Sequence, residues 1–120
     1  MADRVHRVTM FKIPNKENQA KLIAAYAKVD QTNQKATVLL FVRQDGKPYI
    51  KSLIVGSAEE DPRSQGYTVV CKTEFASMDD MKFYDDGCPA HSEFKATARG
   101  LGVEGIMTTY FTPELVRGSS

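Results

Sequence analysis

The sequence predicts an α+β fold in which an antiparallel sheet carries helices on one face. Residues 5–13 and 66–75 alternate with a period of two, which indicates strands with one buried face. Residues 16–34 and 77–101 follow these strands and place apolar side chains at helical spacing. The predicted order is strand, helix, three further strands, two helices and a last strand, which suits a ferredoxin-like sheet.

The 120 residues predict one domain over 1–116 and a disordered polar tail over 117–120. The 16 basic and 15 acidic residues are interspersed, so no charged patch predicts nucleic acid or a membrane as a partner. Cys71 and Cys88 lack CxxC spacing, which favours reduced thiols. The N-terminus lacks the apolar core of a signal peptide, and no run reaches the roughly 18 apolar residues that a membrane span needs. We therefore expect a cytoplasmic protein.

The first strand is predicted over residues 5–13, and its alternation places three side chains on one face: His6, Val8 and Met10. This face is expected to point toward the interior, although Phe11 and Ile13 do not fit the pattern. A shift of the register by one residue would turn His6 to the other face of the sheet.

The first helix is predicted to begin at Lys16, because Pro14 ends the strand and Asn15 is a favourable N-cap residue. Its apolar side chains recur at helical spacing and form one face that packs on the sheet: Leu22, Ile23, Tyr26 and Val29.

Three strands are expected in the middle of the chain. Residues 36–42 and 49–55 are rich in β-branched and aromatic residues, and Asp45-Gly46 between them is typical of a hairpin turn. The polar residues 56–65 are expected to form a surface loop. Cys71 lies in the strand predicted over 66–75, in phase with Val69 and Thr73.

The segment 77–101 carries the most informative chemistry. Ser77 is positioned to cap a helix that contains Tyr84, and Gly87 is expected to end it. Pro89 suits the first position of a second helix. One stripe of that helix is predicted to face the interior: Ala90, His91, Phe94, Ala98 and Leu101. A final strand over 105–111 includes Ile106.

These pieces together resemble the stress-responsive A/B barrel proteins, which form dimeric α+β barrels. The matching segments follow one another along nearly the whole chain: His6–Ile13, the GYT-x5-EF run at Gly66–Phe75, Ser77–Tyr84, the PAH-x2-F run at Pro89–Phe94, and Phe111–Pro113. Residues 36–44 have no counterpart in the family. This insertion could be an extra hairpin strand, a lengthened helix or an error in the gene model.

Because the helices are expected on one face only, the other face of the sheet needs a cover, and we expect a homodimer formed through that face. The resemblance to dimeric barrels implies the same. By resemblance to plant polyketide cyclases of the family, Tyr84 and His91 are the expected catalytic pair. The same resemblance and the predicted faces give the expected substrate-binding residues: His6, Val8, Met10, Leu22, Ile23, Tyr26, Cys71, Phe94 and Ile106. No cofactor is expected, and no metal, because HxH, HExxH and Cys/His ligand spacings are missing from the sequence.

A His and Tyr pair suits ring closure of a poly-β-keto chain, with His taking a carbon-bound proton and Tyr donating to the developing oxyanion. The resemblance thus predicts a metal-independent lyase or cyclase that acts on an aromatic or polyketide-like molecule. Two other functions stay open, a non-catalytic ligand-binding protein and a stress-associated structural protein. A purely structural interpretation also exists, with His91 bonded to a backbone carbonyl and Tyr84 as a core ring.

Overall fold

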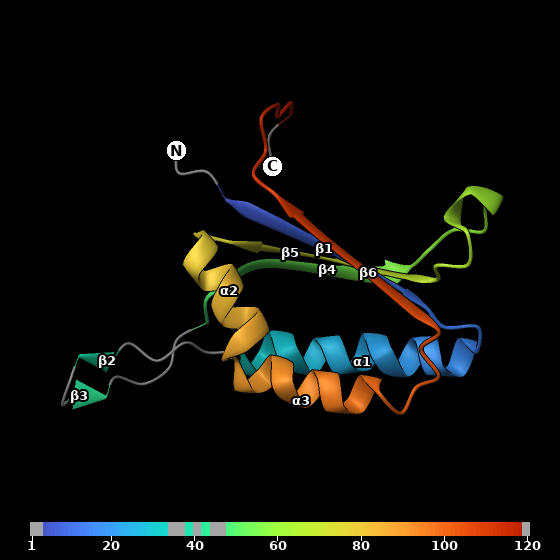
Figure 1. Cartoon of the computed structure of the whole chain (residues 1–120), viewed down its shortest axis with the longest axis horizontal. Coiled ribbons are helices and arrows are strands. Elements are labelled where there is room, and N and C mark those ends of the chain that lie inside the picture. The colour runs from blue at the N-terminus through green and yellow to red at the C-terminus, as the bar shows by residue number, and fades with distance from the viewer. Residues whose placement is uncertain (1–3, 34–37, 40–41, 44–47, 119–120) are drawn as a thin grey trace.

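The computed structural model describes residues 4–33, 38–39, 42–43 and 48–118. Four strands form one antiparallel sheet in the order β4-β5-β1-β6: β1 (Val5–Lys12), β4 (Ile50–Ser57), β5 (Val69–Phe75) and β6 (Gly105–Phe111). Three helices lie on one face of this sheet: α1 (Lys16–Thr32), α2 (Met78–Asp86) and α3 (Pro89–Ala98) (Figure 1). The predicted α+β class is confirmed.

The helices begin at the residues that the sequence indicated, but α3 ends at Ala98, so Leu101 of the predicted stripe lies beyond it, although it is buried. The Asn15 side chain accepts a hydrogen bond from the Asn18 backbone N–H at 2.9 Å. The Ser77 hydroxyl accepts from the Asp80 backbone N–H at 3.1 Å, and Gly87 is the C-cap of α2. Because α3 starts only two residues later, at Pro89, the chain turns sharply and places α2 and α3 at an angle (Figure 1).

The register of β1 differs from the predicted one. Val5, Arg7, Thr9 and Phe11 are buried beneath the helices, whereas the intervening residues lie on the opposite face. The assignment of His6, Val8 and Met10 to the interior is therefore wrong. The physical reason is hydrophobic burial: Phe11 and Ile13 are 3% and 0% exposed, and they bring Arg7 and Thr9 to the same face.

The interior between sheet and helices is filled largely by aromatic rings. Tyr26 of α1 and Phe94 of α3 lie with their ring centroids 4.1 Å apart, and Phe11 of β1 meets both rings edge-on. On α2 the Tyr84 ring packs against Phe75 of β5 at 5.3 Å. These contacts tie each helix to the central strands, since packed aromatic pairs contribute beyond their buried area.

The segment around the insertion differs in part from the prediction. Within the strand predicted over 36–42, Val38–Leu39 (β2) pairs antiparallel with Val42–Arg43 (β3) in a separate two-stranded sheet. The predicted Asp45-Gly46 turn lies outside the described residues. The loop predicted over 56–65 is shorter, because β4 continues to Ser57 and a 3₁₀ turn (η1) spans Pro62–Ser64.

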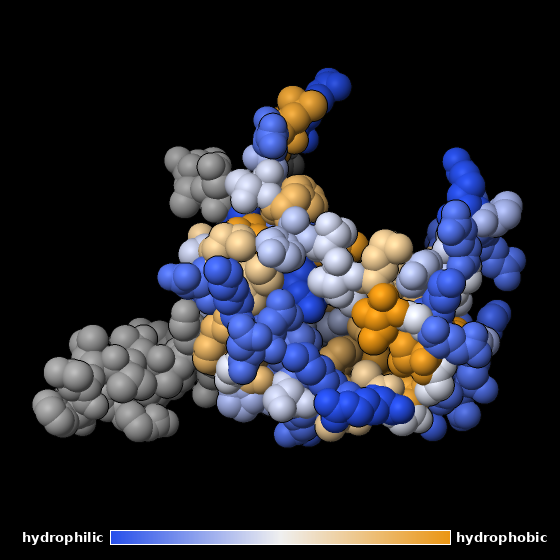
Figure 2. Space-filling view, in the orientation of Figure 1, coloured by the Kyte–Doolittle hydropathy of each residue, from blue (hydrophilic) through white to orange (hydrophobic). Residues whose placement is uncertain are grey.

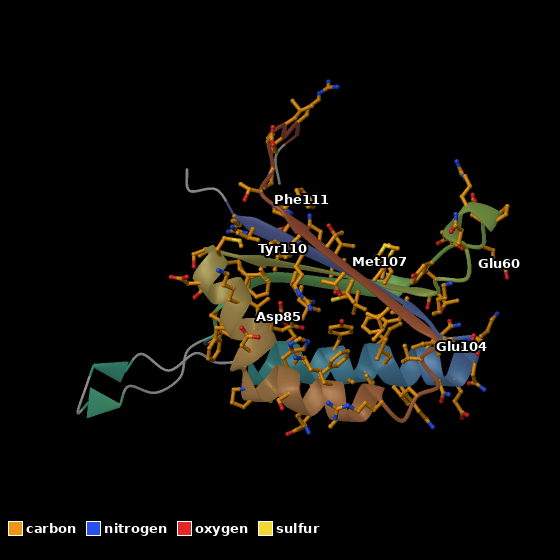
Figure 3. All side chains as sticks on the ribbon, in the orientation of Figure 1. Glu60, Asp85, Glu104, Met107, Tyr110 and Phe111 are labelled. Atoms are coloured by element: carbon orange, nitrogen blue, oxygen red, sulfur yellow. The ribbon has the colours of Figure 1, made fainter. Side chains whose placement is uncertain are left out.

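The sheet face turned away from the helices is partly apolar, and we call it the open face. Cross-strand register places these side chains together on it: Val8, Met10, Ile54, Val70, Met107 and Phe111. Ile54, Met107 and Phe111 are 61%, 46% and 48% exposed. Figure 3 labels Met107 and Phe111 along β6. Among the described helices, none has the length and apolar character needed to cross a bilayer.

Candidate functional site

A cavity of about 590 Å³ lies between the sheet and α3, on the side where β6 forms the edge. Its walls are Arg7, Thr9 and Phe11 of β1, Ile106 and Thr108 of β6, and His91 and Phe94 of α3. Tyr26 of α1 and the segment 103–105 complete it. Figure 2 shows this side of the molecule hollowed between β6 and α3. A cavity of this size is in the range of small-molecule sites.

His91 lies on the cavity wall with one ring nitrogen held by the backbone. Its Nδ1 is 2.7 Å from the Tyr84 carbonyl oxygen. A carbonyl oxygen only accepts hydrogen bonds, so the neutral ring carries its proton on Nδ1. Nε2 then keeps a lone pair, and no hydrogen bond from the described residues occupies it. The structure thus combines the carbonyl-bonded histidine of the structural interpretation with a ring nitrogen that is available as a base.

Tyr84 supports His91 through its ring. The two rings stack with centroids 3.6 Å apart and an interplanar angle of 10°. The Tyr84 hydroxyl is buried and has no hydrogen-bond partner among the described residues, and Tyr84 is not part of the cavity lining. The expectation that both functional groups enter one cavity is therefore corrected: His91 lines it, and the phenol lies behind His91.

Arg7 is the residue of the candidate site that the sequence analysis missed. Its side chain is buried below the helices, where Nη2 donates to Asp85 Oδ1 at 2.8 Å and Nη1 donates to Thr9 Oγ1 at 2.9 Å. The guanidinium also lies 5.0 Å from the centre of the Tyr84 ring. Arg7 and His91 therefore both lie against the Tyr84 ring. Arg7 shares the alternation of the apolar residues Phe11 and Ile13 along the strand, and this pattern could have placed Arg7 in the interior.

The other predicted site residues separate into three groups. Tyr26, Phe94 and Ile106 line the cavity with His91. Leu22, Ile23 and Cys71 belong to the core or pack against it. The third group lies on the open face, away from the cavity: His6, Val8 and Met10. The structure corrects their expected place in the pocket for the register reason given above.

Burial, together with the smaller effect of the Arg7 and Lys95 charges, lowers the pKa of His91 to about 4, while the hydrogen bond to Tyr84 opposes the shift. The imidazole is therefore neutral at neutral pH. Burial also raises the pKa of the Tyr26 and Tyr84 hydroxyls well above the usual value, so both stay protonated. No group of three or more His, Cys, Asp or Glu side chains arranged to hold a metal occurs among the described residues.

This pKa shift predicts a specific dependence of stability on pH. Between pH 4 and about 6.5 the unfolded chain binds a proton at His91 that the folded chain does not, so the free energy of unfolding rises with pH and then levels off. Relative to His91→Asn, the wild type is expected to lose about 3 kcal/mol as the pH falls through this window. Urea unfolding at several pH values measures the difference. Parallel curves for the two proteins would contradict a lowered His91 pKa.

Comparison with known proteins gives both family and fold. The profile described as "Stress responsive A/B Barrel Domain" matches residues 5–107. A curated protein of Gibberella zeae, described as "Fusaristatin A biosynthesis cluster protein", is 45% identical over 119 residues, which cover 99% of this chain and 80% of that protein. The fungal protein is thus a relative over nearly the whole chain.

Solved structures share the fold at low sequence identity. The hydroxynitrile lyase from Passiflora edulis superimposes with a TM-score of 0.71 at 14% identity, covering 98% of this chain and 100% of the lyase. A dimeric ferredoxin-like protein of unknown function from Thermobifida fusca has a TM-score of 0.68 at 13% identity, covering 94% and 93% of the two chains. The ferredoxin-like arrangement predicted from the order of elements is confirmed.

Proposed function

The chain belongs to the family of stress responsive A/B barrel domains, and we propose that it is a cofactor-independent lyase or cyclase acting on an aromatic or polyketide-like molecule. One observation carries the proposal: His91 lines a cavity of about 590 Å³, and the Tyr84 carbonyl fixes the ring tautomer that leaves Nε2 without a proton. The biosynthesis cluster of the fungal relative and the lyase with the same fold support small-molecule chemistry.

The proposed reaction is an aldol-type ring closure. His91 Nε2 removes a proton from a carbon that lies between two carbonyl groups and becomes an imidazolium. The resulting enolate carbon attacks a ketone further along the same chain, and a carbon–carbon bond forms. The imidazolium then returns its proton to the new alkoxide, so the enzyme ends in its starting state. Tyr84 is assigned a positioning role, through its ring and its backbone carbonyl.

The test uses synthetic 3,5,7-trioxooctanoate, a linear poly-β-keto chain that also cyclises slowly without a catalyst. Ring-closed products are separated and quantified by chromatography and mass spectrometry, with and without the protein. We expect faster cyclisation and a change in the product ratio. An unchanged rate together with an unchanged ratio, across chains of different length, would contradict the catalytic proposal.

A second candidate function is binding without turnover. The position of the Tyr84 hydroxyl favours it, because the oxyanion donor expected from the family resemblance lies outside the cavity. A protein of this kind would bind the same poly-β-keto acids, measured by calorimetry, and would leave their cyclisation rate unchanged. Binding and rate measurements on one sample therefore distinguish the two functions.

We propose that two copies associate through the open face. This face exposes apolar side chains of β4 and β6, and structures with this fold include proteins described as dimeric. The cavity lies on the other side of the sheet, so each subunit would hold a complete cavity. The free thiols Cys71 and Cys88 support a cytoplasmic location for this dimer.

Met107→Glu is expected to convert the dimer into a monomer, because each subunit would bury an uncompensated carboxylate in the interface. Met107 is 46% exposed in the single chain, so the monomer itself should stay folded. Met78→Glu is the matched control, since Met78 is 37% exposed on the helix side and an acidic residue suits the start of α2. Sedimentation velocity reports the mass. A dimer that persists in Met107→Glu would place the interface elsewhere.

A further inference from the structure

We propose that the ligand of this cavity carries a carboxylate, which binds at the end formed by Arg7, Thr9 and Thr108, with an apolar tail that extends along β1 toward Phe11. This inference rests on the small-molecule binding proposed above and specifies the chemical class of the molecule. It follows from hydrogen-bond donors without acceptors, from the charges around the cavity and from the distribution of polar and apolar walls.

One hydrogen-bond donor of the Arg7 guanidinium has no acceptor in the described part of the chain. Nη1 and Nη2 are used by Thr9 and Asp85, but the buried Nε–H has no partner among the described residues. Arg7 is 8% exposed, so water gives little compensation. A buried donor without an acceptor costs on the order of 1–3 kcal/mol. Because Arg7 lines the cavity, a ligand whose acceptor reaches the Nε–H recovers this cost when it binds.

The hydroxyls beside Arg7 extend its donor character into the cavity. Thr9 Oγ1 accepts from Arg7 Nη1 and lies 3.1 Å from Thr108 Oγ1 of the adjacent strand β6. When Thr9 donates to Thr108, the Thr108 O–H is free to donate to a bound molecule. The positive charge of the Arg7 guanidinium polarises this chain of hydrogen bonds, which makes the Thr108 O–H a stronger donor. The wall is therefore suited to an anionic oxygen.

Charges around the cavity favour an anion. The lining contains three cations, Arg7, Lys95 and Arg99, and one anion, Glu104. Asp85 offsets part of the Arg7 charge from the α2 side, and Lys95 Nζ is bonded to the Asp85 backbone carbonyl at 2.8 Å. Figure 3 shows Asp85 and Glu104 toward opposite ends of the helix layer. The cationic excess therefore lies near Arg7 and His91, since the acidic residue of the lining is at the far end.

The apolar walls lie away from this end. Arg7 and Phe11 are four residues apart on one strand, which corresponds to roughly 13 Å. Around Phe11 the cavity is lined by Ile106, which pairs with Phe11 across the strands, and by Val103 and Phe94. An amphipathic acid of about eight carbons spans this length, with its carboxylate at Arg7 and its tail at Phe11.

The carboxylate would also act on His91. The positive charges of Arg7 and Lys95 contribute to the lowered pKa of His91, and a bound anion offsets them. The His91 pKa should therefore rise when the ligand binds, and the imidazole becomes a stronger base in the complex. In this way the group that anchors the ligand also prepares the proposed base.

The test compares octanoate with octanamide, which has the same length and no charge, by calorimetry at pH 7. We expect octanoate to bind at least tenfold more tightly to the wild type. Thr108→Val should reduce this preference several-fold, and Thr108→Ser, which keeps the hydroxyl, should retain it. Arg7→Gln should bring the ratio of the two affinities close to one. Thr108 lies on an exposed edge strand, so its variants remain informative if Arg7→Gln does not fold.

The outcomes separate this inference from the proposed function. Equal binding of octanoate and octanamide would overturn the carboxylate assignment and leave a neutral-ligand cavity with the proposed base. A preference for octanoate that survives both Thr108→Val and Arg7→Gln would also overturn it, because the anion would then bind elsewhere. Failure of both molecules to bind at millimolar concentration would contradict the small-molecule cavity itself, and the inference would fall with it.

Discussion

Replacing His91 with Asn is expected to lower the cyclisation rate of 3,5,7-trioxooctanoate by about 10²–10⁴-fold, the usual contribution of a positioned general base. The Asn amide nitrogen occupies a place close to that of His Nδ1, so it can still donate to the Tyr84 carbonyl. The variant therefore removes the Nε2 lone pair and keeps the local hydrogen bond. Initial rates at pH 7, measured against the uncatalysed reaction, give the effect.

Tyr84→Phe is the matched control for this prediction. It removes a hydroxyl that has no partner among the described residues and keeps the ring that stacks on His91. We expect the rate to stay within about threefold of the wild type, and the stability to be equal or slightly higher, because a buried unsatisfied group is lost. A loss of rate as large as that of His91→Asn would restore the hydroxyl to the mechanism.

The second large effect is expected for Arg7→Met, which should lower the free energy of unfolding by about 2–4 kcal/mol. The guanidinium bonds both Asp85 and Thr9 in the interior, and its removal leaves Asp85 without its partner. Breaking a buried ion pair costs about 3–5 kcal/mol, but the Asp85 side chain is 36% exposed, so water reduces the loss. Chemical denaturation with a two-state fit measures the change.

The double variant Arg7→Met with Asp85→Asn tests the cause of that loss. Removing both charges should recover part of the stability, because the largest cost in the single variant is the unpaired carboxylate. Asp85→Asn alone should cost less than Arg7→Met, since the amide can still accept from Arg7. Additive effects of the two single changes would show that Arg7 stabilises the fold by packing alone.

Local signals in the sequence were enough to predict the helices and the order of the main strands. Asn15, Ser77, Gly87 and Pro89 each act on the backbone of their own turn, through a cap or a fixed φ. The helix stripes were also reliable, because a period of 3.6 distinguishes one face from the other over several turns. His91 and Phe94 were therefore correctly placed toward the interior.

The face of β1 was harder to predict, because both phases of the strand contain apolar residues. Val8 and Met10 compete with Val5 and Phe11, and the first pair belongs to the open face. Such a strand, apolar on both sides, has two faces to cover, and its sequence alone does not say which one the helices cover. The error moved His6 into the site and left Arg7 out of it.

The relation between Tyr84 and His91 depends on geometry that spacing does not contain. Seven residues and a helix break separate them, and the stacked rings bring only one functional group to the cavity. The carbonyl hydrogen bond that fixes the His91 tautomer comes from the backbone of Tyr84, which no residue type reveals. Sequence resemblance pointed to both positions, and the structure shows that only His91 lines the cavity.

The most direct test of the account is the protonation of His91, measured by long-range ¹H–¹⁵N correlation NMR of the wild type and of His6→Gln, which leaves a single histidine to assign. At pH 7 we predict a neutral ring with its proton on Nδ1 and an unprotonated Nε2. Titration should give a pKa well below 6.5, near 4. A neutral ring protonated on Nε2, or an imidazolium at pH 7, would contradict the proposal that His91 presents a free base to the cavity.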